Sequence, residues 1–71
     1  MLNKQELKAV MALADDTQEK LANALGITSA GMSGRINGRI DFSVPEIDKI
    51  VARYNLSAED IKRIFFTSNV T

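Results

Sequence analysis

Apolar residues recur along the chain at the three- and four-residue spacing of amphipathic helices. In the first such segment Leu7, Val10, Met11 and Ala14 fall on one helical face. The inward residues predicted for the four later segments are Leu21, Ala24 and Leu25; Met32 and Ile36; Ile47, Ile50, Val51 and Tyr54; and Ile61, Ile64 and Phe65. The pattern therefore predicts an all-α fold, a compact bundle of five short helices.

Capping residues stand at the borders of these segments. Asn3, Thr17, Ser43 and Ser57 each precede a segment and carry a side-chain oxygen that can accept from free helical N–H groups, and Thr28 or Ser29 can do so for the third. Glu6 and Glu46 follow Asn3 and Ser43 at the spacing of a capping box. The residues predicted to end helices are Gly26 and Gly38, as left-handed stops, and Asn55. The predicted organisation is one domain over residues 1–66 and a C-terminal tail over 67–71.

The pair Asn37-Gly38 also supports a different local structure. This dipeptide is a strong hairpin signal, and apolar Ile40, Phe42 and Val44 alternate after it. However, two glycines would lie in the first strand of such a hairpin, and Ser43 serves better as a helix cap. We therefore expect a third helix that runs to Asn37, then a turn, then an extended loop from Ile40 to Ser43.

Composition removes most catalytic chemistry. The 71 residues include no cysteine and no histidine, which excludes thiolate and imidazole metal sites, disulfides and His-based catalysis. Asp15-Asp16 and Glu59-Asp60 are the adjacent carboxylates, and neighbours in sequence point apart on a helix. No apolar run is long enough for a membrane span. We expect no enzyme activity, no cofactor, no metal and no membrane partner.

Charge is balanced overall but uneven along the chain. Nine Lys and Arg residues offset nine Asp and Glu residues, so the formal net charge is zero. Between Lys20 and Ile40, however, the charged residues are Lys20, Arg35 and Arg39, with no acid. This window predicts a locally positive surface if the fold places it on one face.

The second and third predicted helices are separated by Gly26, Ile27 and Thr28. So short a connection forces a sharp crossing, and Ala22 is small enough to let the two helices approach. The spacing of Gln18, Ala22, Gly26, Met32 and Ile36 is that of a helix-turn-helix.

The sequence around this corner resembles a known family. Thr17–Ala22 (TQEKLA), Leu25–Thr28 (LGIT) and Ile36–Arg39 (INGR) are similar to the Cro/CI-type, lambda-repressor-like DNA-binding domain. The likeness extends through Phe42–Ile50 and Leu56–Ile61. Within the family, the Ile36–Arg39 ending followed by the Asp41–Ser43 loop is similar to small phage and prophage regulators. It implies a five-helix fold with a helix-turn-helix at helices two and three, a transcriptional regulator that binds double-stranded DNA, and a cytoplasmic location in a bacterial or phage-infected cell.

The resemblance and the helix geometry together suggest DNA contacts. A helix N-terminus suits a phosphate, and Gln18 stands at the start of the second helix. The resemblance implies that Gln18 contacts the DNA backbone and buttresses the third helix. On a helical wheel Ser33, Gly34 and Asn37 face away from the core, in position for the major groove. Ala30 can touch a thymine methyl, and Asn37 and Arg39 resemble the family's phosphate contacts. The full set of candidate contacts is Thr17, Gln18, Thr28, Ser29, Ala30, Ser33, Gly34, Arg35, Asn37 and Arg39.

This sequence departs from the family where bases would be contacted. Its third helix offers serines, an alanine and two glycines, Gly31 and Gly34, and each glycine costs a helix about 1 kcal/mol relative to alanine. An alternative is therefore a helix-turn-helix used for protein–protein interaction, antitoxin-like or adaptor-like, with weak DNA binding. Arg35 and Arg39 have an alternative of their own, as surface ion pairs with Asp41 or Glu46.

Phe65-Phe66 near the end of the chain is a further feature. A helix easily buries one of two adjacent phenylalanines and rarely both. The second is then packed by the tail or offered to a partner. A homodimer through the fifth helix and tail, with Phe65 and Phe66, would suit DNA binding because paired half-sites lie about 34 Å apart.

Overall fold

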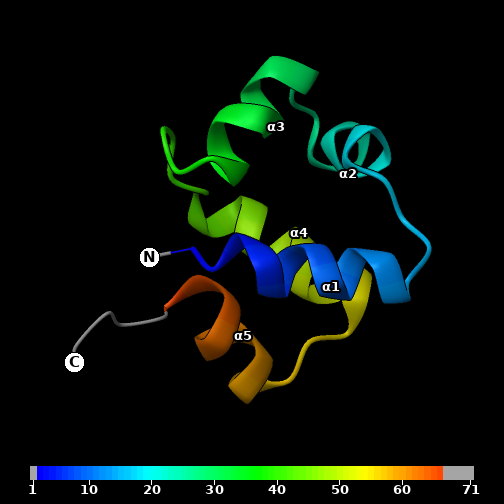
Figure 1. Cartoon of the computed structure of the whole chain (residues 1–71), viewed down its shortest axis with the longest axis vertical. Coiled ribbons are helices and arrows are strands. Elements are labelled where there is room, and N and C mark those ends of the chain that lie inside the picture. Colours follow the sequence, from blue (N-terminus) through cyan, green and yellow to red (C-terminus); the bar gives the residue numbers. More distant parts are fainter. Residues whose placement is uncertain (1, 67–71) are drawn as a thin grey trace.

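The computed structural model describes residues 2–66 of the chain as five α-helices (Figure 1). They are α1 (Lys4–Leu13), α2 (Gln18–Leu25), α3 (Ser29–Ile36), α4 (Val44–Tyr54) and α5 (Ala58–Phe65). No strand occurs within this range, so the predicted all-α class is confirmed and the hairpin alternative is wrong. Asn37 is instead the C-cap of α3, Gly38 takes a φ of 82°, and residues 40–43 form neither helix nor strand. The predicted tail, 67–71, lies outside the described residues.

Side-chain caps begin all five of these helices. In each case an oxygen accepts a hydrogen bond from the backbone N–H three residues later; the caps are Asn3, Thr17, Thr28, Ser43 and Ser57. Thr28, rather than Ser29, caps α3. Full capping boxes form at Ser43–Glu46 and Ser57–Asp60. The box predicted at Asn3 is half formed, since the Glu6 carboxylate forms an ion pair with Arg63 in α5.

The core receives one completely buried side chain from each helix: Leu7, Leu21, Met32, Ile50 and Ile64. Two alanines predicted to point inward are exposed. Ala14 lies beyond the end of α1, which stops at Leu13. Ala24 is on the outer side of α2, because α2 packs on α3 and α4 through the side that carries Ala22, which is buried.

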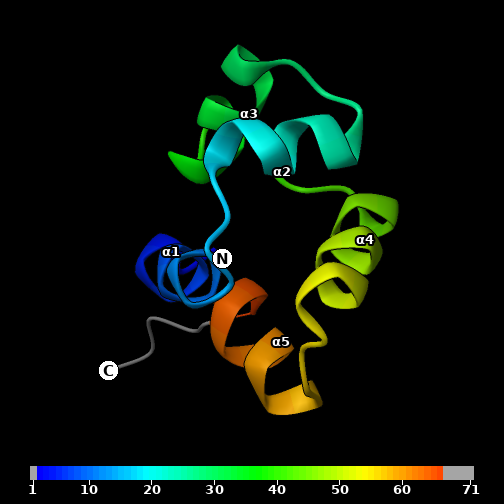
Figure 2. The ribbon, with the colours of Figure 1, turned by 90° about the vertical axis from the view of Figure 1, so that its right-hand side faces the viewer.

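The helices stack along the long axis of the molecule. Figures 1 and 2 both show α3 at one end of this axis, with α2 beside it, and α5 toward the other end. α1 packs on α5, and the Asn3 N–H donates to the Ile64 carbonyl over 2.7 Å. The loop before α4 is fixed by an edge-to-face contact between Phe42 and Phe65, whose ring centroids are 5.9 Å apart. Over residues 2–66, every helix is too short or too polar to cross a bilayer.

Candidate nucleic-acid interface

A tight turn sets the angle between α2 and α3. Gly26 ends α2 in the left-handed conformation, with φ 73° and ψ 29°, as predicted. The Ile27 N–H donates back to the Ala22 carbonyl over 3.0 Å, and the Thr28 hydroxyl accepts from the Gly31 N–H over 3.0 Å. Ala22 is 2% exposed, so its methyl group is enclosed where the two helices meet. The three-residue connection therefore turns the chain abruptly and starts α3 at once.

One side of α3 is open to solvent at the end of the molecule. Ser29, Ala30 and Asn37 are exposed on it, and Ser33 is half-buried. The Asn37 amide nitrogen is 3.3 Å from the Ser33 hydroxyl oxygen and donates to it. The opposite side carries Met32 and Ile36 into the core, as predicted. This exposed side is called the outer face of α3 below.

Gly34 does not belong to the outer face, and the prediction that placed it there is wrong. The chain folds back after α3, so that the N–H groups of Arg39 and Ile40 both donate to the Gly34 carbonyl. The Ile40 side chain then covers Gly34, which is buried. A Cβ atom at Gly34 would lie 2.9 Å from Ile40 Cδ1. A helical wheel treats the helix as isolated and so misses this cover.

Arg35 turns away from the outer face toward α4. Its Nε lies 2.9 Å from Glu46 Oε1, and its Nη2 lies 3.1 Å from Oε2. This geometry confirms the ion-pair alternative for Arg35, with Glu46 as partner. The hydrogen bonds from Arg35 and those from Ser43 hold the pKa of Glu46 below its usual range, against the opposing effect of burial. Arg39 is exposed, and among the described residues it makes no ion pair, so the same alternative is not realised there.

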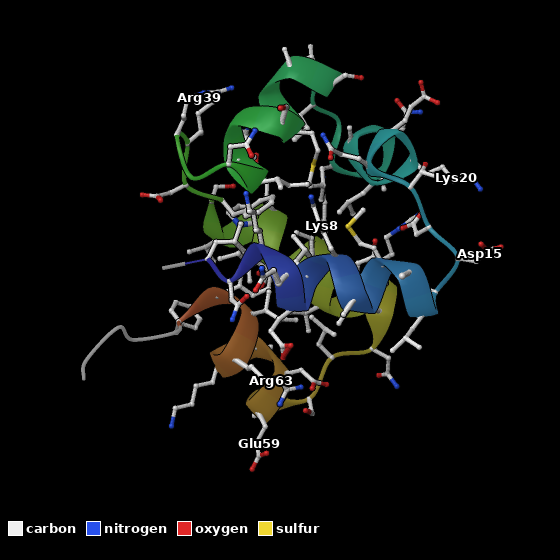
Figure 3. All side chains as sticks on the ribbon, in the orientation of Figure 1. Lys8, Asp15, Lys20, Arg39, Glu59 and Arg63 are labelled. Atoms are coloured by element: carbon white, nitrogen blue, oxygen red, sulfur yellow. The ribbon has the colours of Figure 1, made fainter. Side chains whose placement is uncertain are left out.

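The start of α2 presents polar groups near α3. Thr17 and Gln18 are exposed, and the Thr17 hydroxyl accepts from the Lys20 N–H over 3.1 Å. Within residues 2–66 the Gln18 side chain makes no hydrogen bond to α3, and its role as a buttress of α3 stays a prediction. Figure 3 shows Arg39 and Lys20 on opposite sides of the half of the molecule formed by α2 and α3, with Asp15 next below Lys20, whereas Glu59 lies at the opposite end.

The loop before α2 holds a polar cluster that sequence analysis missed. Asp16 accepts from Arg53 Nε and Nη2 over 2.7 and 3.1 Å, from the Tyr54 hydroxyl, and from the Thr17 N–H over 3.0 Å. The Arg53 hydrogen bonds, with those of Tyr54 and Thr17, hold the pKa of Asp16 well below its usual range. Burial and then the hydrogen bond to Asp16 raise the pKa of Tyr54 to about 12. The cluster ties the start of α2 to the end of α4.

No local pattern could have revealed this cluster. Asp16 is separated from Arg53 by 37 positions and from Tyr54 by 38. The sequence shows an aspartate directly before a helix cap and a tyrosine in the predicted core stripe, but it does not indicate that these two residues are partners.

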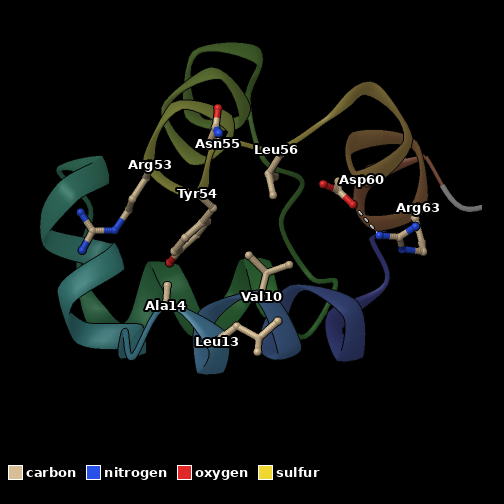
Figure 4. A pocket seen from close by; sticks show the side chains of 9 residues that line it. All are labelled: Val10, Leu13, Ala14, Arg53, Tyr54, Asn55, Leu56, Asp60 and Arg63. Carbon is tan, nitrogen blue, oxygen red and sulfur yellow. Dashed lines mark hydrogen bonds and ion pairs between the residues drawn. The ribbon is translucent and has the colours of Figure 1, made fainter.

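A surface hollow of about 510 Å³ lies elsewhere, between α1, the end of α4 and the start of α5 (Figure 4). It is lined by Val10, Leu13, Ala14, Arg53, Tyr54, Asn55, Leu56, Asp60 and Arg63. None of these residues belongs to α2 or α3. Both of its arginines are already paired, Arg53 with Asp16 and Arg63 with Glu6 and Asp60. In the described part of the chain, no group of three or more His, Cys, Asp or Glu residues could hold a metal ion.

The candidate interface is therefore the outer face of α3, the exposed start of α2 and the cations at this end of the molecule. Of the ten residues predicted to form it, Gly34 is buried and Arg35 is held by Glu46, while the other eight border or lie on this exposed surface. No protein-family model matches the chain, and no curated protein matches it.

Proposed function

We propose that this chain is a DNA-binding transcriptional regulator of the lambda-repressor-like type, which places the outer face of α3 in the major groove. The observation that carries the proposal is the exposure of that face at the end of the molecule, directly after the Gly26–Thr28 turn. A helix-turn-helix needs this combination, because its second helix must enter the major groove while its first helix crosses the DNA backbone.

The surrounding groups suit the phosphate backbone. The first turn of α2 has free N–H groups and the positive end of the helix dipole, beside exposed Gln18. Lys20 and Arg39 add positive charge at the same end of the molecule, which the exposed Glu19 in the first turn of α2 partly offsets. In this proposal these groups fix the position of the domain on the duplex, which is the role of phosphate contacts in DNA recognition.

Base contacts would come from small side chains. Ser29 and Ser33 can exchange hydrogen bonds with base edges, and the methyl group of Ala30 can meet a thymine methyl. Short side chains let the helix backbone come close to the bases but contact few of them. Sequence preference then depends on a small number of hydrogen bonds, on bridging water and on DNA shape.

A second copy of the chain is part of the proposal. Phe65 is 6% exposed, whereas its neighbour Phe66 is 60% exposed at the end of α5. A pair of domains that meet through this region would contact paired half-sites about 34 Å apart. Sedimentation equilibrium tests this step: the Phe66→Ser variant should shift the chain toward monomer, and a wild-type chain that stays monomeric at high concentration would refute it.

The DNA-binding proposal is tested by titration with a random-sequence duplex at several salt concentrations. The logarithm of the binding constant should fall with the logarithm of salt concentration, by about 0.9 for each phosphate contacted. Arg39→Ala should weaken binding to all duplexes and reduce this slope by about one phosphate. Ser33→Ala should act only on particular sequences.

Lys62→Ala is the matched control, since Lys62 is an exposed cation in α5, away from α2 and α3. Because α5 is also the proposed dimer region, sedimentation equilibrium should first show that this variant associates like the wild type. Its removal should leave the slope unchanged. A flat salt response of the wild-type chain would refute DNA binding and favour the protein-interaction alternative.

A further inference from the structure

We propose that Arg35 and Glu46 form a positioning pair, which fixes α3 on α4 and holds the outer face at its angle, and that Arg35 is not itself a DNA contact. The part of this inference that concerns DNA rests on the proposed function. The part that concerns the orientation of α3 does not, and it can be tested on the free protein.

The pair is one link in a chain of hydrogen bonds across two elements. Arg35 Nη1 donates to the Gly31 carbonyl in the first turn of α3, over 3.0 Å. Its Nε and Nη2 donate to the two oxygens of Glu46, and Glu46 Oε1 also accepts from the Ser43 N–H over 3.0 Å. One side chain therefore connects the beginning of α3 to the N-terminal cap of α4.

The chemistry of these hydrogen bonds favours a rigid connection between α3 and α4. The Arg35 and Glu46 side chains are 17% and 15% exposed, so solvent screens their attraction only weakly. A guanidinium presents its N–H groups in a fixed fork that matches a carboxylate, and lysine cannot reproduce this geometry. Glu46 is itself held by the Ser43 capping box, so Arg35 meets an acceptor that is already in place.

Gly31 has a role in this arrangement. A Cβ atom at Gly31 would lie 3.1 Å from Arg35 Nη1 and 3.2 Å from Thr28 Oγ1. Such contacts are tighter than an ordinary van der Waals contact. The absence of a side chain at Gly31 lets Arg35 fold back along α3 to the carbonyl. One of the two glycines that weaken α3 is therefore explained by the positioning pair.

The same contacts argue against a phosphate role for Arg35. Its Nε, Nη1 and Nη2 each donate to an acceptor within the domain. These bonds use three of the five N–H donors of a guanidinium, and the side chain is 17% exposed, so little of Arg35 is open to a phosphate. Arg39 has no such ties within residues 2–66 and is the better candidate for a DNA contact.

The first experiment measures amide hydrogen exchange of the free protein. The variants are Arg35→Met, which keeps the apolar stem, and Glu46→Gln, which keeps an acceptor for the capping box. Both should speed exchange of the amides in Met32–Ile36 roughly tenfold relative to those of α1, because charge-assisted hydrogen bonds are lost. Lys62→Met, at an exposed cation in α5, is the control and should change nothing. Unchanged exchange in both variants would overturn the proposal.

The second experiment repeats the duplex titration with these variants and with Arg35→Lys. A positioning pair predicts that Arg35→Met, Arg35→Lys and Glu46→Gln all weaken binding by similar factors and keep the wild-type salt slope. A phosphate contact predicts the opposite pattern: Arg35→Lys retains binding, Arg35→Met lowers the slope by about 0.9, and Glu46→Gln tightens binding by removing an anion.

Failure of the proposed function can be distinguished from failure of the positioning pair. A wild-type chain that binds no duplex refutes the proposed function, and the exchange measurement alone then decides the positioning pair. A wild-type chain that binds DNA, with the phosphate-contact pattern at Arg35, refutes the positioning pair and leaves the proposed function intact.

Discussion

The polar cluster around Asp16 gives a strong prediction for stability. Asp16→Asn replaces one carboxylate oxygen by an NH₂ group. Oδ1 accepts from Thr17 and Arg53, and Oδ2 accepts from Arg53 and Tyr54. An NH₂ group in place of Oδ1 faces two N–H donors. In place of Oδ2 it faces the Arg53 Nε–H, whereas the Tyr54 hydroxyl can turn and accept from it. The Asp16 side chain is 6% exposed, so water does not readily take over these bonds.

The magnitude follows from the bonds that are lost. In either orientation of the amide a hydrogen bond to the charged Arg53 disappears and the negative charge is lost, and such a charge-assisted bond contributes about 1.5–3 kcal/mol when well buried. The Arg53 side chain is 36% exposed, which reduces this value. We expect a loss of about 2–3 kcal/mol. A chain of 71 residues has a total stability of about 4–10 kcal/mol, so the loss is a large fraction of it.

The assay is urea unfolding followed by helical circular dichroism. Asp15→Asn is the matched control: Asp15 is exposed, it has a φ of 55°, and asparagine tolerates this conformation as well as aspartate does. Because the pKa of Asp16 is depressed in the folded state, its contribution should be full above pH 3.8, its ordinary value, and shrink as the pH falls below. Equal stability of the two variants at pH 7 would refute the role assigned to Asp16.

Three further outcomes are expected. Tyr54 is the single tyrosine in a chain without tryptophan, so near-ultraviolet absorbance follows the ionisation of Tyr54 alone. In the folded protein the Tyr54 hydroxyl should titrate with a pKa of about 12 rather than 10.0, and its contribution to stability should be lost as the pH rises between these values. Titration near 10 while circular dichroism still shows helix would contradict the structure. Gly34→Ala should stabilise the Ile40→Ala variant by about 1 kcal/mol, the difference in helix propensity. The same substitution should stabilise the wild type by less, because there the Ile40 side chain must move. Equal effects on the free energy of unfolding in this double-mutant cycle would mean that Ile40 does not cover Gly34. Gly26→Ala should cost about 1 kcal/mol in thermal or urea unfolding because of its positive φ alone, since no atom lies within 4 Å of the added Cβ, and Gly26→Asn should cost less; a larger loss for Asn would refute this explanation.

The sequence predicted the parts of the fold that depend on local chemistry. The caps at Thr17, Ser43 and Ser57 and the left-handed stops at Gly26 and Gly38 are all where the pattern placed them. Each of these features depends on one short side chain, or on a missing one, and on groups within a few residues. For this reason five helices and their order could be predicted without any knowledge of their packing.

Predictions failed where distant segments meet. Gly34 was assigned to the exposed side because a helical wheel contains no loop, and Ile40 covers it. For Arg35 the sequence offered both an ion pair and a DNA contact, and only the packing of α4 selects Glu46 as its partner. Asp16 received no role, since its partners are far along the chain. Side-chain partners across elements depend on helix crossing angles, which periodicity does not specify.

The most direct test of the central claim is an amide chemical-shift map of the labelled chain titrated with duplex DNA. If the outer face of α3 enters the groove, the largest shifts should fall on Ser29–Asn37 and on the first turn of α2, at Thr17 and Gln18. The amides of α5 near Glu59, at the opposite end of the molecule, should stay unchanged. The largest shifts on α5, with α3 unmoved, would contradict the account.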